Sequence, residues 1–125
     1  MGMGDVQGKV LPKVSLLSKS VNNNSIVSRY FTPYSCHETH AVTGTCCVAS
    51  SCLIPGTVGF RLLNKKDSLN CNTETIKIEH PMGFIDCIIV LNSNFKNNLV
   101  SKKDLVKSCG IYRTSRILMK GQVYL

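Results

Sequence analysis

The sequence lacks the features that mark membrane and exported proteins. It has no uninterrupted apolar run near the roughly 20 residues that a membrane helix requires. Its first ten residues, MGMGDVQGKV, show neither the apolar centre of a secretory signal nor the arginine-rich, amphipathic pattern of a transit peptide. We therefore expect a cytoplasmic location and no membrane partner.

Motifs for common cofactors and hydrolytic sites are also missing. The chain contains no Gly-rich phosphate loop, dinucleotide fingerprint, EF-hand loop or Ser/His/Asp order. No repeat, low-complexity tract or linker divides its 125 residues, and a chain of this length closes one hydrophobic core but not two. We expect a single domain over residues 1–125.

Acidic residues are scarce, with 7 Asp and Glu against 15 Lys and Arg, so the formal net charge is +8. This charge would suit nucleic acid or an anionic ligand. The basic residues are scattered through predicted loops and termini, and they do not alternate with aromatic residues as in proteins that stack bases. We favour a solvated basic surface without a nucleic-acid partner. A basic nucleic-acid-binding or non-catalytic interaction module is the alternative.

The seven cysteines form no paired C-x-x-C spacing, and several stand in apolar stretches, which predicts reduced thiols. Cys36, His37 and His40, followed by Cys46 and Cys47, contain enough ligands for zinc, but their spacing matches no structural zinc pattern. We therefore predict no metal. A thiol in the first turn of a helix can be a nucleophile, although buried structural cysteines are more common.

Short runs of apolar and β-branched residues predict strands, and polar stretches between them predict loops. The strands are expected at Val10–Ser18, Ser25–Thr32, Thr57–Leu63, Thr73–Glu79, Gly83–Leu91 and Ser108–Tyr112, with loops at Asn64–Asn72 and Asn92–Asp104. Arg113–Lys120 predicts a short helix that ends at Gly121, and Val123–Leu125 a final strand or tail.

Residues 41–54, AVTGTCCVASSCLI, are almost entirely small or apolar and predict a helix that is buried on all sides. Thr43 is the expected N-cap, and Pro55 with Gly56 marks the end of the helix. About six strands around one helix make an α+β lobe with a mixed sheet wrapped around a central buried helix.

Two segments have the chemistry to hold a small anion. At the helix start, Thr43-Gly44-Thr45, unpaired backbone N–H groups and the positive end of the helix dipole form an anion site, and an ordinary N-cap with a packing glycine is the alternative. The segment His80-Pro81-Met82-Gly83 places an imidazole at a strand end, where functional residues often lie. A simple β-turn is the alternative there.

A third segment, Arg113-Thr114-Ser115-Arg116, has two arginines three residues apart. On a helix they would share one face and could clamp a carboxylate or phosphate. Arginines on a terminal helix are usually solvated, so a solvated pair is the alternative.

Four blocks, in order, resemble the carboxy-terminal portion of the PrpF family, which includes 2-methylaconitate isomerase, methylitaconate isomerase and 4-oxalomesaconate tautomerase. The blocks are Gly4 to Val14, Ala41 to Val58 (AVTGTCC and IPGTV), Ile78 to Gly83 (IEHPMG) and Ile111 to Tyr124 (IYRTSRILMKGQVY). Four ordered blocks over almost the whole chain are more specific than any single motif.

The resemblance implies a diaminopimelate-epimerase-like fold, in which two similar lobes each wrap a sheet around a central helix and the active site lies between the helix starts. It implies a cofactor-independent isomerase that moves a proton on a small unsaturated di- or tricarboxylic acid such as methylaconitate. This chain would be the carboxy-terminal, substrate-binding lobe, partnered by a first lobe or by a second copy. The lysine and cysteine that move the proton would lie in the first lobe.

Combining the motifs with the resemblance, we predict seven substrate-binding residues in this chain, while the catalytic residues stay unknown and are expected in the first lobe. The seven are Thr43, Gly44, Thr45, Cys46, His80, Met82 and Gly83. Many relatives have serine in the His-Pro-x-Gly turn, where this chain has Met82. The change removes a hydroxyl donor and bears on substrate identity.

Overall fold

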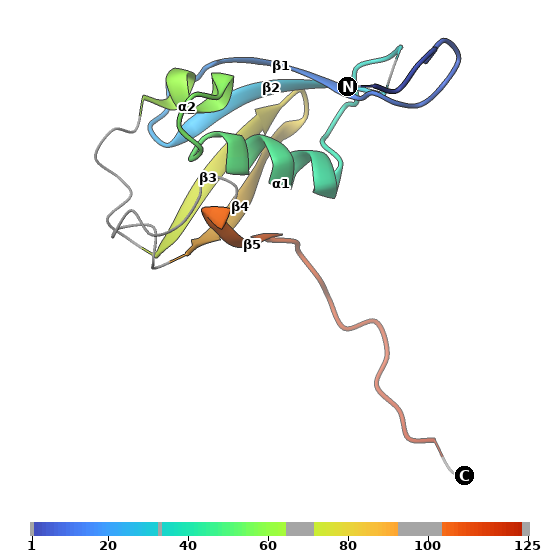
Figure 1. The fold of residues 1–125 in the computed structure, drawn as a ribbon. Helices are drawn as coiled ribbons and strands as arrows, with labels where there is room; N and C mark the ends of the chain where they lie inside the picture. Colours follow the sequence, from blue (N-terminus) through green and yellow to red (C-terminus); the bar gives the residue numbers. More distant parts are fainter. Residues whose placement is uncertain (1, 33, 65–71, 93–103, 124–125) are drawn as a thin grey trace.

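The computed structural model describes residues 2–32, 34–64, 72–92 and 104–123, which form five strands and two helices (Figure 1). Residues 65–71 and 93–103, which hold most of the two predicted loops and Cys71, lie outside these ranges. So do Pro33 and residues 124–125, at the end of the predicted final strand or tail.

The strands form one mixed sheet in the order β1-β2-β3-β4-β5. β1 (Val14–Lys19) and β2 (Ser25–Phe31) pair antiparallel. β2 then pairs parallel with β3, because both helices lie in the connection between these two strands. Parallel neighbours need such a crossover, whereas antiparallel ones need only a turn.

The second half of the sheet is a meander. β3 (Thr73–His80) pairs antiparallel with β4 (Gly83–Leu91), and β4 pairs antiparallel with β5 (Val106–Ile111). The predicted strands at Ser25–Thr32, Thr73–Glu79 and Gly83–Leu91 are confirmed to within one residue at either end. The predicted Val10–Ser18 strand begins later, at Val14, and the Ser108–Tyr112 strand begins earlier, at Val106.

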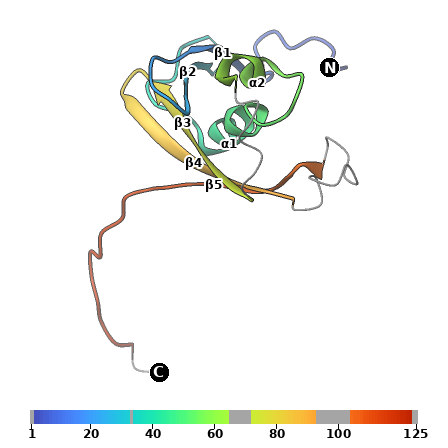
Figure 2. The ribbon, with the colours of Figure 1, turned by 90° about the vertical axis from the view of Figure 1, so that its left-hand side faces the viewer.

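Alternation along the strands separates a core face from an outer face. In β3 the side chains of Ile76, Ile78 and His80 are buried, whereas those between them are more exposed. The core face meets α1, which contacts β3, β4 and β5, and α2, which contacts β1 and β2. Both helices lie on the same side of the sheet, and the sheet curls around α1 (Figure 2). The central helix and mixed α+β sheet are therefore observed, while the diaminopimelate-epimerase-like lobe stays a prediction.

The central helix, α1, spans Val42–Ser51, and two details of its prediction are wrong. The helix starts at Val42, before Thr43, so its N-cap is Ala41, whose methyl side chain makes no capping hydrogen bond. The helix is also not buried on all sides. Val42, Thr43 and Cys47 are exposed, since no element among the described residues covers that side.

The segment predicted as a strand at Thr57–Leu63 is instead the short helix α2, Val58–Leu63. Thr57 is its N-cap, and the hydroxyl accepts a hydrogen bond from the Phe60 amide at 3.2 Å. Asn64 ends the helix in a left-handed conformation with φ 51°. These two caps outweigh the strand preference of the apolar residues between them.

The short helix predicted at Arg113–Lys120 is absent, and residues 112–123 run without regular secondary structure away from the sheet (Figure 1). Ile117, Leu118 and Met119 are all more than 80% exposed. An isolated segment of this length gains too little from its own hydrogen bonds to stay helical without packing. Neither helix among the described residues is long and apolar enough to cross a membrane.

Candidate functional site

The turn between β3 and β4 holds His80 in a fixed position. Pro81 and Met82 form a two-residue loop, and His80 pairs with Gly83 across it. Gly83 has φ 137°, a conformation that favours glycine. The Met82 amide donates to His80 Nδ1 at 3.3 Å and to the Glu38 carbonyl oxygen at 3.2 Å. The β-turn that was the alternative for this segment is therefore present, and it also orients the imidazole.

A cavity of about 330 Å³ lies beside this turn. Its walls come from the segment before α1, from β3 and β4, and from the residues after β5. The lining residues are Thr39, His40, His80, Phe84, Ile85, Asp86, Tyr112, Arg113 and Thr114. The Tyr112 amide donates to the Asp86 carbonyl oxygen at 3.1 Å, which holds the start of the C-terminal segment against β4 and sets Arg113 at the cavity.

Two of these groups are available to a ligand. His80 is only 9% exposed, and because its Nδ1 accepts from the Met82 amide, its neutral form carries the proton on Nε2. Within the described residues, neither Nε2 of His80 nor the guanidinium of Arg113 has a hydrogen-bond or ion-pair partner. Asp86 in contrast pairs with Lys77 at 3.5 Å. The cavity thus offers N–H donors suited to a carboxylate.

His40 lines the same cavity, but its ring nitrogens are both engaged. Nδ1 lies 3.3 Å from the Ala41 carbonyl oxygen and 3.1 Å from the Thr45 hydroxyl, and Nε2 lies 3.0 Å from the Ser28 hydroxyl. Because a carbonyl oxygen only accepts, we assign the proton to Nδ1, so Nε2 accepts from Ser28. His40 therefore ties β2 to the start of α1.

The electrostatics of His40 agree with this structural role. Burial lowers the pKa of His40 below 6.5, and the nearby His80 and His37 lower that pKa further, although the hydrogen bond to the Ala41 carbonyl opposes the shift. The ring of Tyr30 lies over the imidazole, with centroids 4.6 Å apart. The imidazole is therefore neutral at pH 7, and its hydrogen bonds fix its place in the cavity wall.

The start of α1 is a second candidate anion site, separate from the cavity beside His80. Thr45 makes the first backbone bond of α1, to the Ala41 carbonyl oxygen at 2.8 Å, so only the amides of Val42, Thr43 and Gly44 are left without a helical partner. Thr43 and Gly44 line a groove of about 370 Å³, which also includes Lys13, Ser15, Tyr30, Cys47, Val48 and Ser51. This groove is distinct from the cavity beside His80.

The seven predicted binding residues are thus not brought to one pocket. Thr43 and Gly44 line the groove with Lys13, and His80 lines the cavity with Arg113. Gly83 lines a third hollow on the outer face of the sheet, of about 550 Å³, which His80 also reaches. The remaining three lie elsewhere. Thr45 is fully buried, Met82 is 70% exposed, and Cys46 lies beside Cys87 and Cys109.

Some residues of the cavity carried no recognisable signal in the sequence. Asp86, which lines the cavity, and Ser28, which bonds to the cavity residue His40 without lining the cavity itself, are single polar residues inside strands. Only the folded sheet shows what they contact. The sequence predicts Arg113 as one of an arginine pair on a helix. In the structure Arg113 lines the cavity and Arg116, on an extended segment, does not.

The residues considered for zinc are also separated by the fold. Cys36 and Cys47 are exposed, and His37 Nδ1 accepts from the Thr39 amide at 3.1 Å. Cys46 instead approaches two cysteines from the sheet.

The sequence of this chain is similar to that of one protein family over almost its whole length. The family model described as PrpF protein matches residues 9–125. "Putative isomerase YbhH" of Escherichia coli (strain K12) is 35% identical over 125 residues, which is 100% of this chain and 32% of that protein. The 4-oxalomesaconate tautomerase of Pseudomonas putida is 32% identical over 123 residues, which is 98% of this chain and 30% of that protein.

A third relative, the 3-methylitaconate isomerase of Eubacterium barkeri, is 30% identical over 100 residues, which is 80% of this chain and 23% of that protein. The chain thus spans 32% or less of the length of these three relatives.

Proposed function

Because the chain belongs to the PrpF family, we propose that it is the substrate-binding lobe of a cofactor-independent isomerase that moves a proton on a small unsaturated di- or tricarboxylic acid. The names of two relatives support this substrate class, since one is an oxalomesaconate tautomerase and another a methylitaconate isomerase. Methylaconitate is a further candidate from the resemblance described above.

The observation that carries the proposal is that Arg113 and His80 line the same cavity. They come from positions 33 residues apart (113 minus 80), yet both line the same 330 Å³ space. An arginine can hold a carboxylate through two parallel N–H···O bonds, and an imidazole N–H can add a third. Such a carboxylate would be oriented by the β3–β4 turn on one side and by the segment after β5 on the other.

The chemistry explains why a proton-moving enzyme needs such donors. Removing a proton from a carbon in conjugation with a carboxyl group leaves a carbanion, whose charge spreads onto the carboxylate oxygens and along the allylic system. Donors that are already in place stabilise that charge without reorganising. The proton then returns at another carbon, and the double bond moves. In our proposal this chain binds and orients the carboxylate, and groups outside it move the proton.

The same proposal includes a second lobe that closes the site. On the outer face of the sheet, Val14, Leu16 and Phe84 are 50% exposed or more, and no helix among the described residues covers them. Val14 and Leu16 are neighbours on the edge strand β1, whereas Phe84 lies on β4 with β2 and β3 between them. Exposed apolar side chains can be covered by a partner. A first lobe or a second copy of the chain is the partner we expect, in the cytoplasm.

Binding is tested first, with the 125-residue chain labelled with ¹⁵N and titrated with 3-methylitaconate. We expect saturable shifts in the amide resonances of Met82 and Arg113. Two ligand controls are matched: the dimethyl ester, which has the same carbon skeleton without charge, and succinate, which has two carboxylates without a double bond. Shifts as large with the ester as with the acid would overturn carboxylate binding at this cavity.

Turnover is tested separately, by the ultraviolet absorbance of the conjugated double bond. The chain is assayed alone and mixed with a separately expressed first lobe of a relative. We expect turnover only in the mixture. No turnover in any combination, together with DNA retention that falls steeply with salt, would instead favour the basic binding module.

A further inference from the structure

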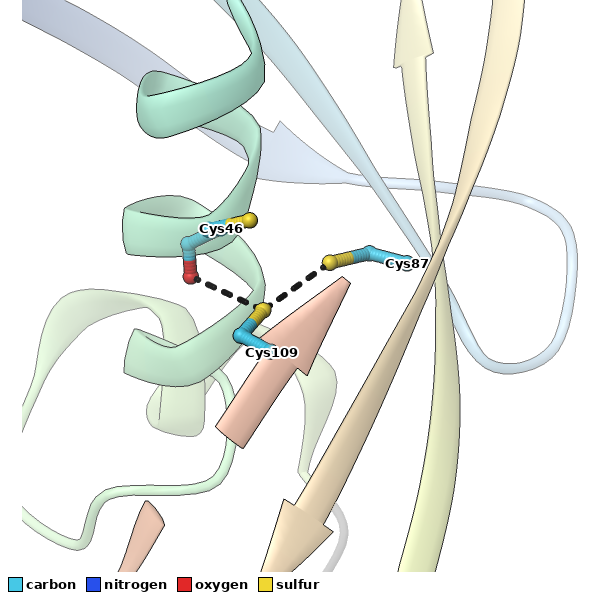
Figure 3. Close-up of side chains that lie close together, drawn as sticks. All are labelled: Cys46, Cys87 and Cys109. Atoms are coloured by element: carbon cyan, nitrogen blue, oxygen red, sulfur yellow. Dashed lines mark hydrogen bonds between the residues drawn. The ribbon is translucent and has the colours of Figure 1, made fainter. Parts of the chain in front are cut away.

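Three cysteines from separate elements converge between α1 and the sheet. Cys46 comes from α1, Cys87 from β4 and Cys109 from β5, and their sulfur atoms all lie within 4.8 Å of one another. The sulfurs of Cys87 and Cys109 are 3.2 Å apart, and the Cys109 thiol donates to the Cys46 carbonyl oxygen at 3.8 Å. Figure 3 shows the three side chains pointing toward one another.

The spacing is close to what one shared metal ion requires. A metal–sulfur bond of about 2.3 Å places three sulfurs around one ion about 4 Å apart. The closest pair would have to separate by a little under 1 Å, and no other pair would have to approach by more than about the same amount. Changes of this size are within reach of side-chain rotation, because Cys46 and Cys109 are only partly buried.

The residues around the three cysteines favour a soft metal ion that is stable with three sulfur ligands. Cys87 is completely buried and belongs to the same hydrophobic core cluster as Val48 and Ile89. Among the described residues, no histidine or carboxylate joins the three thiols. Sulfur ligands favour soft ions such as monovalent copper, whereas structural zinc almost always takes four protein ligands.

We propose that Cys46, Cys87 and Cys109 form a three-sulfur site for one monovalent copper ion. On binding, three S–H bonds are replaced by three copper–sulfur bonds and three protons leave to solvent. Copper stays in the +1 state, so the step needs no oxidant or reductant. Because binding releases protons, copper affinity rises with pH.

The test is an anaerobic titration of the chain with Cu(I), supplied as its acetonitrile complex, against a chromophoric Cu(I) chelator. We expect one equivalent to bind, with a sulfur-to-copper charge-transfer band and only sulfur neighbours in X-ray absorption. The Cys46→Ala/Cys109→Ala variant should bind at least about 100-fold more weakly, since even the loss of an outer-shell contact costs 10–100-fold. It leaves the core residue Cys87 in place.

The two exposed cysteines, Cys36 and Cys47, offer a matched control, because replacing them removes the same number of thiols. The Cys36→Ser/Cys47→Ser variant should bind copper as the parent chain does. Circular dichroism and thermal unfolding of each variant check that it is folded, and a single Cys109→Ala change provides a milder variant. Equal copper affinity in the cluster variant and the control would overturn the proposal. Tighter binding of zinc than of copper by the same three residues would overturn the choice of ion.

Discussion

The ring of Tyr30 lies directly over the backbone of Gly44. A Cβ atom at residue 44 would come within 2.6 Å of the ring carbon Cε2 and within 2.8 Å of Cζ. Tyr30 is itself 6% exposed and packs against His40, so it has little room to move. The close approach that requires glycine at the start of α1 is therefore made by a side chain of the same domain, which supports the packing alternative for Gly44 over a ligand.

Replacement of Gly44 by alanine should destabilise the fold. Forcing an extra carbon into a packed site costs about 1–3 kcal/mol, which exceeds the gain of less than about 1 kcal/mol that alanine brings to a helix. Urea unfolding followed by circular dichroism measures the difference. Tyr30→Leu in the same chain should recover part of the loss in a double-mutant cycle. Additive effects of the two changes would contradict the contact.

The hydrogen bond from Ser28 to His40 should contribute measurably to stability. Ser28→Ala leaves the buried Nε2 of His40 without a donor, at a cost of about 1–3 kcal/mol. Ser18→Ala in β1 is the matched control, because Ser18 is exposed and should change the free energy of unfolding by less than about 0.5 kcal/mol. Equal losses in the two variants would argue against a special role for the His40 network.

Protonation of His40 should weaken the fold at acid pH. Burial lowers the pKa of the folded-state imidazole below 6.5, so the unfolded state takes up its proton first as the pH falls. The contribution of His40 is then complete above pH 6.5 and is lost as the pH falls through the lower folded-state pKa. Nuclear magnetic resonance of the imidazole C–H protons measures that pKa directly. A value at or above 6.5 would contradict the burial.

Glu79 should stabilise the fold at neutral pH and lose this effect in acid. Its Oε1 accepts from Ser20 at 2.7 Å, Asn22 at 2.9 Å and Ser25 at 2.6 Å, and hydrogen bonds from these three side chains lower the pKa of Glu79 to about 2. The depressed pKa means that the stabilisation is present above pH 4.5 and lost as the pH falls through about 2.

The corresponding variant is Glu79→Gln. Because the carboxylate is partly solvated, we expect a loss of about 1 kcal/mol at pH 7. The difference between variant and parent should shrink as the pH approaches 2, and unfolding in urea at several pH values follows it. A loss that does not vary with pH would show that the charge of Glu79 is not involved.

Arg113 and Arg116 should differ in their effect on ligand binding. Arg113→Met should weaken the binding of 3-methylitaconate about tenfold, which corresponds to about 1.4 kcal/mol. Arg116→Met removes the same charge from the same segment, but Arg116 does not line the cavity, so its effect should stay within about twofold. Isothermal titration calorimetry compares the two. Equal weakening would mean that the net charge of the segment, and not the cavity, attracts the acid.

Much of the local structure follows from the sequence. The β-branched and apolar residues of Thr73–Glu79 and the apolar run Gly83–Leu91 predict β3 and β4, and the alternate side chains of β3 point to opposite faces. The small and apolar residues after Ala41 predict α1, and Pro55 after it sets a limit to the helix. α2 was missed because its signal lies in the two caps, Thr57 and Asn64, and not in the apolar residues between them.

The fold, in contrast, decides which of these residues meet. Cys46 and Cys109 are 63 residues apart in the chain, and they come together because β5 is the sheet edge under α1. β3 ends at His80, and β5 ends shortly before Arg113. These two residues line the same cavity because β3 and β5 lie on either side of β4. Periodicity is a local property that tells which side chains face inward. Their neighbours across the core depend on strand order and sheet curvature, which only the tertiary structure determines.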